Sequence, residues 1–81
     1  MSKDEIFNDV KAIVVDELDI DADKVKLDAN IQDDLDADSL DVFEIMNELE
    51  DKFDIELDSD ESVKTIGDVV DLVAKQIAAK D

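Results

Sequence analysis

Apolar residues recur at helical spacing in three segments of the chain, separated by stretches that are mostly polar. The first segment runs from about Lys3 to Leu18, and Ser2 followed by Glu5 has the form of a capping box at its start. The apolar residues of this segment would form one buried face: Ile6, Val10, Ile13, Val14 and Leu18, with Phe7 at one edge. The pattern predicts an amphipathic helix.

The second segment predicts a helix that has Asp38 as its N-cap and ends near Asp51 or Lys52. With residues placed about 100° apart, the core-facing arc consists of Val42, Ile45, Met46, Leu49 and Phe53. Acidic residues fall on the opposite side, with Asn47 beside them: Asp41, Glu44, Glu48 and Asp51. Leu40 and Phe43 point to the same outer half, so this helix is predicted to expose two large apolar side chains among acids.

The third segment predicts a helix that starts near Thr65, with Asp68 as its capping-box partner. Its buried stripe would be Ile66, Val69, Val70, Val73 and Ile77, and Lys75 and Lys80 near its end suit the helix dipole. A short helical turn is predicted to start near Ser59 and to include Val63. A long loop runs from Asp19 to about Ala37, and we expect its scattered apolar residues to anchor it in the core: Val25, Leu27, Ile31 and Leu35.

These elements predict an all-α fold. We expect a small antiparallel bundle of three main helices plus one short helix, with a long loop between the first and second helices. The single glycine and the absence of proline agree with a helical chain. At this length the whole chain, residues 1–81, is expected to form one domain.

The composition excludes several kinds of function. The chain has 26 acidic and 8 basic residues, a formal net charge of −18, and neither His nor Cys. Nucleophile pairs built on His and zinc sites built on Cys are therefore excluded. Nucleic-acid binding needs a cationic surface, so it is excluded as well. No stretch resembles a signal peptide or approaches the roughly 20 apolar residues of a membrane span, so we expect a cytoplasmic protein without membrane insertion.

Metal binding and catalysis are not expected from the carboxylates. The segment from Asp19 begins like a calcium-binding EF-hand loop, but Lys24 stands where the sixth residue should be Gly and Asn30 where the twelfth should be Glu. We therefore expect no metal site. The carboxylates are predicted to be solvated, and a bundle this small has little volume for a substrate pocket. We therefore expect no catalytic residues and no enzyme activity.

The acidic side of the second predicted helix is unusual for a surface that serves stability alone. It contains three like-charge pairs at helical spacing, each costing about 0.2–0.5 kcal/mol: Asp41–Glu44, Glu44–Glu48 and Glu48–Asp51. Either this side is acidic because the whole protein is acidic, or it docks cationic partners. The outward Leu40 and Phe43 favour docking, because charges steer an approaching partner and exposed apolar groups anchor it.

The segment Asp34–Asp41, which reads DLDADSLD, resembles the attachment-site motif of acyl carrier proteins. The continuation to Leu57 resembles the acidic second helix of that family, its Phe and the Ile-Glu-Leu that follows. Further downstream, Asp60-Glu61 and Thr65-Ile66 also match in kind and spacing. The resemblance covers essentially the whole chain.

The resemblance implies that Ser39 carries 4′-phosphopantetheine, taken from coenzyme A, through a phosphodiester. The thiol of this arm would hold a growing fatty acyl chain as a thioester, so the protein would be a carrier that shuttles intermediates between discrete enzymes. Family members hide the acyl chain among their helices, and by that likeness the candidate lining residues are Val42, Met46, Leu49 and Phe53. A serine at the start of a helix also suits a phosphate, because backbone N–H groups are unpaired there.

The resemblance also implies partners with basic docking patches. These are a phosphopantetheinyl transferase (holo-acyl-carrier-protein synthase), ketoacyl synthases, reductases, dehydratases and acyltransferases. The protein itself is expected to be a monomer. The candidate contact residues are Asp38, Leu40, Asp41, Phe43, Glu44, Glu48, Glu50 and Asp51, of which Glu50 lies off the main stripe. Two residues depart from the family pattern. In the family, Gly is frequent at the position of Asp36, and an apolar residue is common at the position of Asn47. We expect these two differences to affect the choice of partner more than the attachment of the arm.

Two other functions stay open at this point. One is a specialised carrier of the same fold that serves polyketide, aminoacyl or D-alanyl transfer. A D-alanyl carrier would be expected to lack Asp41 and to have a less uniformly acidic second helix. The other is an acidic interaction module without a prosthetic group, which would need no modification of Ser39.

Overall fold

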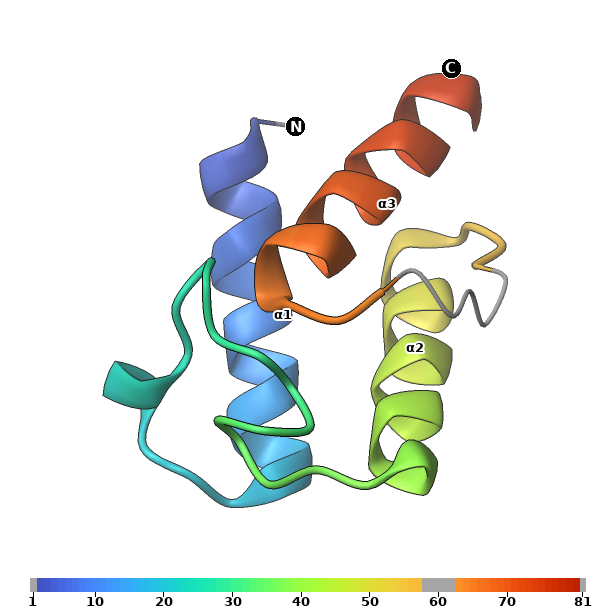
Figure 1. Ribbon diagram of the computed structural model, residues 1–81. Coiled ribbons are helices and arrows are strands. Elements are labelled where there is room, and N and C mark those ends of the chain that lie inside the picture. Colours follow the sequence, from blue (N-terminus) through green and yellow to red (C-terminus); the bar gives the residue numbers. More distant parts are fainter. Residues whose placement is uncertain (1, 58–62, 81) are drawn as a thin grey trace.

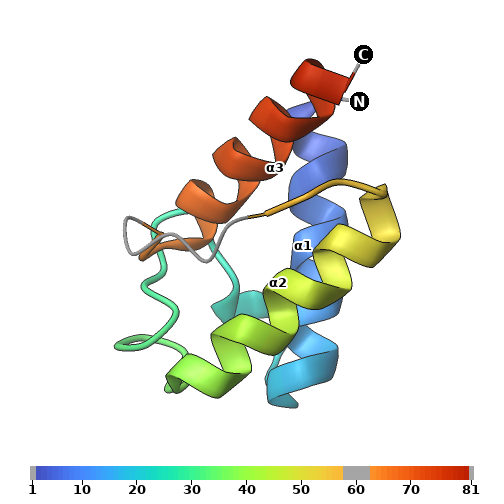
Figure 2. The same ribbon diagram turned by 90° about the vertical axis from the view of Figure 1, so that its right-hand side faces the viewer.

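A computed structural model describes residues 2–57 and 63–80. It contains the α-helices α1 (Lys3–Leu18), α2 (Ser39–Phe53) and α3 (Ile66–Lys80), and the 3₁₀ turn η1 (Ala22–Lys24), as Figure 1 shows. α1 and α2 run in opposite directions, and the start of α1 lies at the same end of the molecule as the end of α3 (Figure 2). The described residues therefore confirm an all-α bundle with a long loop between its first two main helices.

The helix boundaries follow the predicted caps. Ser2 Oγ accepts a hydrogen bond from the Glu5 N–H at 3.3 Å and caps α1. At the start of α3, Thr65 Oγ1 accepts from the Asp68 N–H at 3.1 Å, and Asp68 accepts in return from the Thr65 and Lys64 N–H groups at 3.1 Å each. These backbone donors hold the pKa of Asp68 below its usual value, since they stabilise the carboxylate.

The three predicted stripes meet in one hydrophobic core. α1 contributes Ile6, Val10 and Val14. The other two helices bury most of their stripes: Ile45, Met46 and Leu49 of α2, and Ile66, Val69, Val70 and Val73 of α3. The remaining members of the three stripes are half-buried and pack against this core: Ile13, Leu18, Val42, Phe53 and Ile77. Helical periodicity therefore identified the buried face of each helix.

The long loop is anchored in this core by Val25, Ile31 and Leu35, as predicted, and also by two alanines, Ala29 and Ala37. The prediction for Leu27 was wrong, because its side chain is 54% exposed. The backbone of Leu27 makes the inward contact instead, since its carbonyl accepts a hydrogen bond from the Gly67 N–H at 2.8 Å.

The loop also joins the segment that leads into α3. The Ile31 N–H donates to the Lys64 carbonyl at 2.9 Å, and the Ile66 N–H donates to the Ala29 carbonyl at 3.0 Å. A β-carbon on Gly67 would lie 2.9 Å from the Leu27 carbonyl oxygen, so the one glycine of the chain stands where two backbones approach closely.

One short element was not predicted, and one predicted element falls mainly outside the described residues. η1 interrupts the long loop at Ala22–Lys24 and was not predicted, because three residues are too few to show a period. The turn predicted to begin near Ser59 falls mainly on residues 58–62, which lie outside the described residues, and Val63 belongs to no helix.

Candidate functional site

Ser39 is the first residue of α2, and its side chain is exposed. A reciprocal capping box holds it there. The Asp38 carboxylate accepts from the Asp41 N–H at 2.9 Å, and the Asp41 carboxylate accepts from the Asp38 N–H at 3.3 Å. The two bonds bracket Ser39 and fix the start of the helix, so the hydroxyl is presented to solvent in a defined place.

The backbone at this helix start has unpaired donors. The first hydrogen bond of the helix runs from the Val42 N–H to the Asp38 carbonyl at 3.1 Å. Within the part of the chain that the structure describes, the N–H groups of Ser39 and Leu40 donate no hydrogen bond. Unpaired N–H groups and the helix dipole favour a phosphate at Ser39, whereas the neighbouring carboxylates oppose it. The balance suits a phosphodiester held by a covalent bond better than the capture of a free anion.

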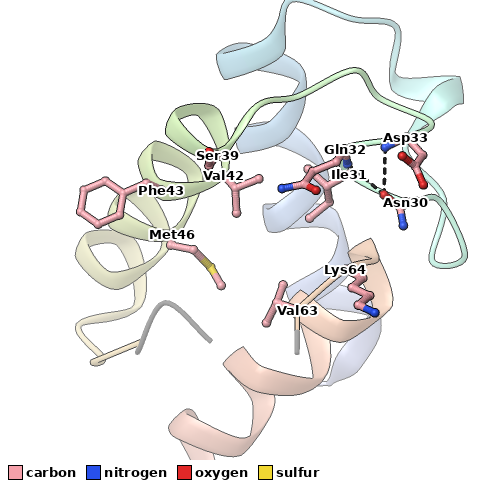
Figure 3. Close-up of a pocket in the computed structure, with 10 residues that line it drawn as sticks. All are labelled: Asn30, Ile31, Gln32, Asp33, Ser39, Val42, Phe43, Met46, Val63 and Lys64. Atoms are coloured by element: carbon pink, nitrogen blue, oxygen red, sulfur yellow. Dashed lines mark hydrogen bonds between the residues drawn. The ribbon is translucent and has the colours of Figure 1, made fainter. Parts of the chain in front are cut away.

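A pocket of about 620 Å³ opens beside Ser39 (Figure 3). It lies between the long loop, the first turns of α2 and the residues that precede α3. Ten residues line it: Asn30, Ile31, Gln32, Asp33, Ser39, Val42, Phe43, Met46, Val63 and Lys64. Apolar side chains from three parts of the chain thus face a serine hydroxyl and a polar rim, an arrangement that fits a long flexible group attached at Ser39.

The pocket contains half of the residues expected to line an acyl site. Val42 and Met46 line it, but Leu49 and Phe53 do not. Leu49 lies about one turn beyond Met46 and is 0% exposed, enclosed by other core residues, and Phe53 is half-buried at the far end of α2. An apolar stripe does not show which of its members border a void.

Several lining residues were not identified as such from the sequence. Ile31 was predicted only to anchor the loop, and Phe43 was assigned to the docking side. Gln32 had no predicted role, and Val63 was predicted only as part of a short helical turn. Ile31 and Gln32 belong to the long loop, Phe43 to α2 and Val63 to the segment before α3. These three segments meet only through the tertiary fold, so no local pattern could have grouped the four residues.

The outer side of α2 has the predicted character. Leu40 is 73% exposed and Phe43 is 54% exposed. The predicted contact residues Asp38, Glu44, Glu48 and Asp51 are exposed, whereas Asp41 and Glu50 are half-buried. Asp41 is partly covered because its carboxylate belongs to the capping box. We call the residues Asp38, Leu40, Asp41, Phe43, Glu44, Glu48 and Asp51 the acidic face.

An acidic residue of α1, Glu17, lies close to Glu44 and Glu48 of α2, where the two helices meet (the seam between α1 and α2). Partial burial and the nearby carboxyl groups of Glu44 and Glu48 raise the pKa of Glu17, a half-buried residue of α1.

Among residues 2–57 and 63–80, no group of three or more acidic side chains is arranged to hold a metal ion. No helix in those ranges is long and apolar enough to cross a membrane.

Asp36 has a left-handed backbone conformation, with φ of 60°. It lies three residues before Ser39, at the position where the resemblance to acyl carrier proteins leads one to expect glycine. The next residue, Ala37, is buried, and its N–H donates to the Ile31 carbonyl at 3.1 Å. The chain therefore turns sharply at Asp36 to return from the core to the start of α2, and the turn requires a positive φ.

Comparisons with known proteins agree with this geometry. The family described as "Phosphopantetheine attachment site" matches residues 8–73. The acyl carrier protein of a Picosynechococcus species is 44% identical over 93% of this chain and 95% of its own length. That of Streptococcus thermophilus is 45% identical over 88% of this chain and 95% of its own length. A solved structure of the acyl carrier protein from Enterococcus faecalis superimposes with a TM-score of 0.76 at 38% identity, covering 94% of this chain and 99% of that one.

Proposed function

This chain belongs to the acyl carrier proteins, and from that membership we propose that Ser39 is the residue that bears its 4′-phosphopantetheine arm. The protein is a carrier of fatty acyl chains and not an enzyme. The thiol of the arm supplies the thioester bond to the cargo, and the side chains of this chain present, shelter and deliver it.

The observation that carries the assignment to Ser39 is its position. Its side chain is exposed at the first position of α2 and also borders the pocket of about 620 Å³. A transferase can reach the hydroxyl from solvent, and an arm attached there can turn either outward or into the pocket. The unpaired N–H groups of Ser39 and Leu40 stabilise the phosphodiester.

We propose that the apolar part of the same pocket shelters the acyl chain. Val42 and Met46 from α2, Ile31 from the long loop and Val63 before α3 form this part. Each methylene that the pocket removes from water contributes about 0.8 kcal/mol. Met46 is 4% exposed and suits this role, because its flexible thioether side chain adapts to cargo of different lengths.

The acidic face is the proposed docking surface for enzymes with basic patches. The proposed partners are the phosphopantetheinyl transferase and the ketoacyl synthases, reductases, dehydratases and acyltransferases of fatty acid synthesis. Each exposed ion pair is worth about 0–1 kcal/mol, so complexes form and dissociate quickly, as a shuttle requires. The monomeric state and the cytoplasmic location expected from the sequence remain predictions.

A loading assay tests the assignment to Ser39. The chain is incubated with coenzyme A, magnesium and a broad-specificity phosphopantetheinyl transferase, and its intact mass is measured. Wild type is expected to gain one arm and Ser39→Ala none. Ser2→Ala is the matched control, because Ser2 is also an exposed serine at a helix start, and it is expected to load like wild type. An unchanged wild-type mass, or loading of Ser39→Ala, would contradict the proposal.

A further inference from the structure

Gln32 places a neutral hydrogen-bonding group in the pocket beside Ser39. Its exposed side chain reaches across the pocket towards Val42 (Figure 3), and both residues line the same cavity. Its carboxamide has no hydrogen-bond partner among the described residues. A carboxamide both donates and accepts hydrogen bonds, so Gln32 offers the pocket one group of each kind.

The backbone of Gln32 is fixed from both sides. The Oδ1 atom of Asn30 accepts hydrogen bonds from the Gln32 N–H at 3.0 Å and from the Asp33 N–H at 2.9 Å, as the dashed lines in Figure 3 show. The preceding residue, Ile31, is 2% exposed and its N–H donates to the Lys64 carbonyl. The fold therefore already fixes the backbone of Gln32, and a contact made by its carboxamide has to order only the side chain.

The other polar side chains that line the pocket are less suited to an uncharged ligand group near a phosphodiester. Asp33 is acidic and would repel the phosphate. The ammonium group of Lys64 points away from the pocket in Figure 3. Asn30 already uses its Oδ1 atom for the two backbone N–H groups. Gln32 is thus the pocket residue whose neutral donor and acceptor are both available.

We propose that Gln32 is a positioning residue for the prosthetic arm, an inference that rests on the arm proposed above. Pantetheine contains two secondary amides, each with one N–H donor and one carbonyl acceptor. The Gln32 carboxamide pairs with one of these amides and draws the arm along the pocket, so that a thioester-linked chain enters between Val42 and Met46. Because Gln32 is neutral, it does this without adding repulsion to the phosphodiester.

Hydrogen exchange at the arm tests this proposal in the loaded protein. Wild type, Gln32→Ala and Gln32→Glu are loaded from coenzyme A that carries ¹⁵N in its two pantetheine amides, and exchange of these amides is followed by NMR. Loss of one hydrogen bond is expected to speed exchange at one of them by about two- to tenfold in Gln32→Ala. Gln32→Glu keeps an acceptor, loses the donor and adds a charge, so its exchange is also expected to be faster. The matched control is Gln76→Ala, the other glutamine of the chain, which does not line this pocket.

The melting temperatures of the four proteins separate positioning from stability, because a purely structural role of Gln32 would change the melting temperature without a selective change at one arm amide. In wild type, nuclear Overhauser contacts between the Gln32 carboxamide and the arm are expected, and this measurement needs no variant to fold. Equal exchange in all loaded proteins, or the absence of these contacts, would overturn the proposal for Gln32 alone. Intact mass is measured first, and failure of wild type to load would overturn the proposed function itself.

Discussion

Asp38 and Asp41 cap each other across Ser39: the Asp41 N–H donates to the Asp38 carboxylate at 2.9 Å, and the Asp38 N–H donates to the Asp41 carboxylate at 3.3 Å. Each carboxylate therefore belongs to the frame that presents the serine, and each also lies on the acidic face. The same residues thus start α2, fix the attachment residue and contribute to the charge that an approaching enzyme meets.

Substitution of the N-cap separates these roles. Asp38→Ala removes the acceptor for the Asp41 N–H and is expected to lower the free energy of unfolding by about 0.5–2 kcal/mol. Asp38→Asn keeps an oxygen acceptor and removes the charge, so its stability should stay close to wild type while loading by the transferase slows. Chemical denaturation and initial loading rates measure the two effects. If Asn destabilised the protein as much as Ala, the capping argument would fail.

Asp36→Gly is expected to stabilise the protein. The φ of 60° is unfavourable for a residue with a β-carbon, and glycine removes that cost. Part of the gain is offset because glycine is more flexible in the unfolded chain, which leaves a net gain of about 0.5–1 kcal/mol. Asp36→Asn is the control, since it removes the charge but keeps a β-carbon. An Asp36→Gly protein no more stable than Asp36→Asn in denaturant titrations would show that backbone strain is absent.

Glu17→Gln is expected to raise the melting temperature at neutral pH. The pKa of Glu17 lies above its ordinary value of 4.5, so the folded state holds this proton more tightly than the unfolded state. The free energy of unfolding therefore falls as pH rises from 4.5 through the pKa that Glu17 has in the folded protein. Glu17→Gln has no proton to lose at this position, so its free energy of unfolding does not fall in this way. Melting curves across pH should show no difference below 4.5 and the largest difference at neutral pH.

The control for this comparison is Asp23→Asn, which removes an exposed charge in η1, away from the seam between α1 and α2. A similar pH-dependent gain in that variant would mean that net charge, and not the contact of Glu17 with Glu44 and Glu48, is responsible.

Neutralising the acidic face is expected to slow partner reactions without unfolding the protein. Glu44→Gln and Glu48→Gln should each reduce kcat/KM of the phosphopantetheinyl transferase by up to about fivefold at low salt, the value of one exposed ion pair. The reduction should shrink as salt is added. Glu56→Gln removes an exposed carboxylate beyond the end of α2 and serves as the control. An equal loss in the Glu56 variant would assign the effect to overall charge.

Local sequence signals predicted the helices and the position of Ser39 well, because both depend on neighbouring residues. Ser2, Asp38 and Thr65 were each recognisable as caps, and the exposure of Leu40 followed from its angle on the helix. Such features arise within one or two helical turns, so a single sequence contains the information.

Features that depend on distant contacts were not predictable in the same way. Leu27 was assigned to the core, but its orientation depends on the approach of its carbonyl to Gly67 in another element. The pocket joins Ile31, Val42 and Val63, which no sequence period connects. The positive φ of Asp36 depends on how the buried loop returns to α2, although the resemblance had marked that position as one where glycine is frequent.

The most direct test of the central claim is fragmentation mass spectrometry of the protein isolated from the cell that naturally makes it. The account predicts a 4′-phosphopantetheine group on the peptide that contains Ser39, with part of the population extended by a fatty acyl thioester. Ser39 found unmodified throughout, or the arm found on any other residue, would contradict it.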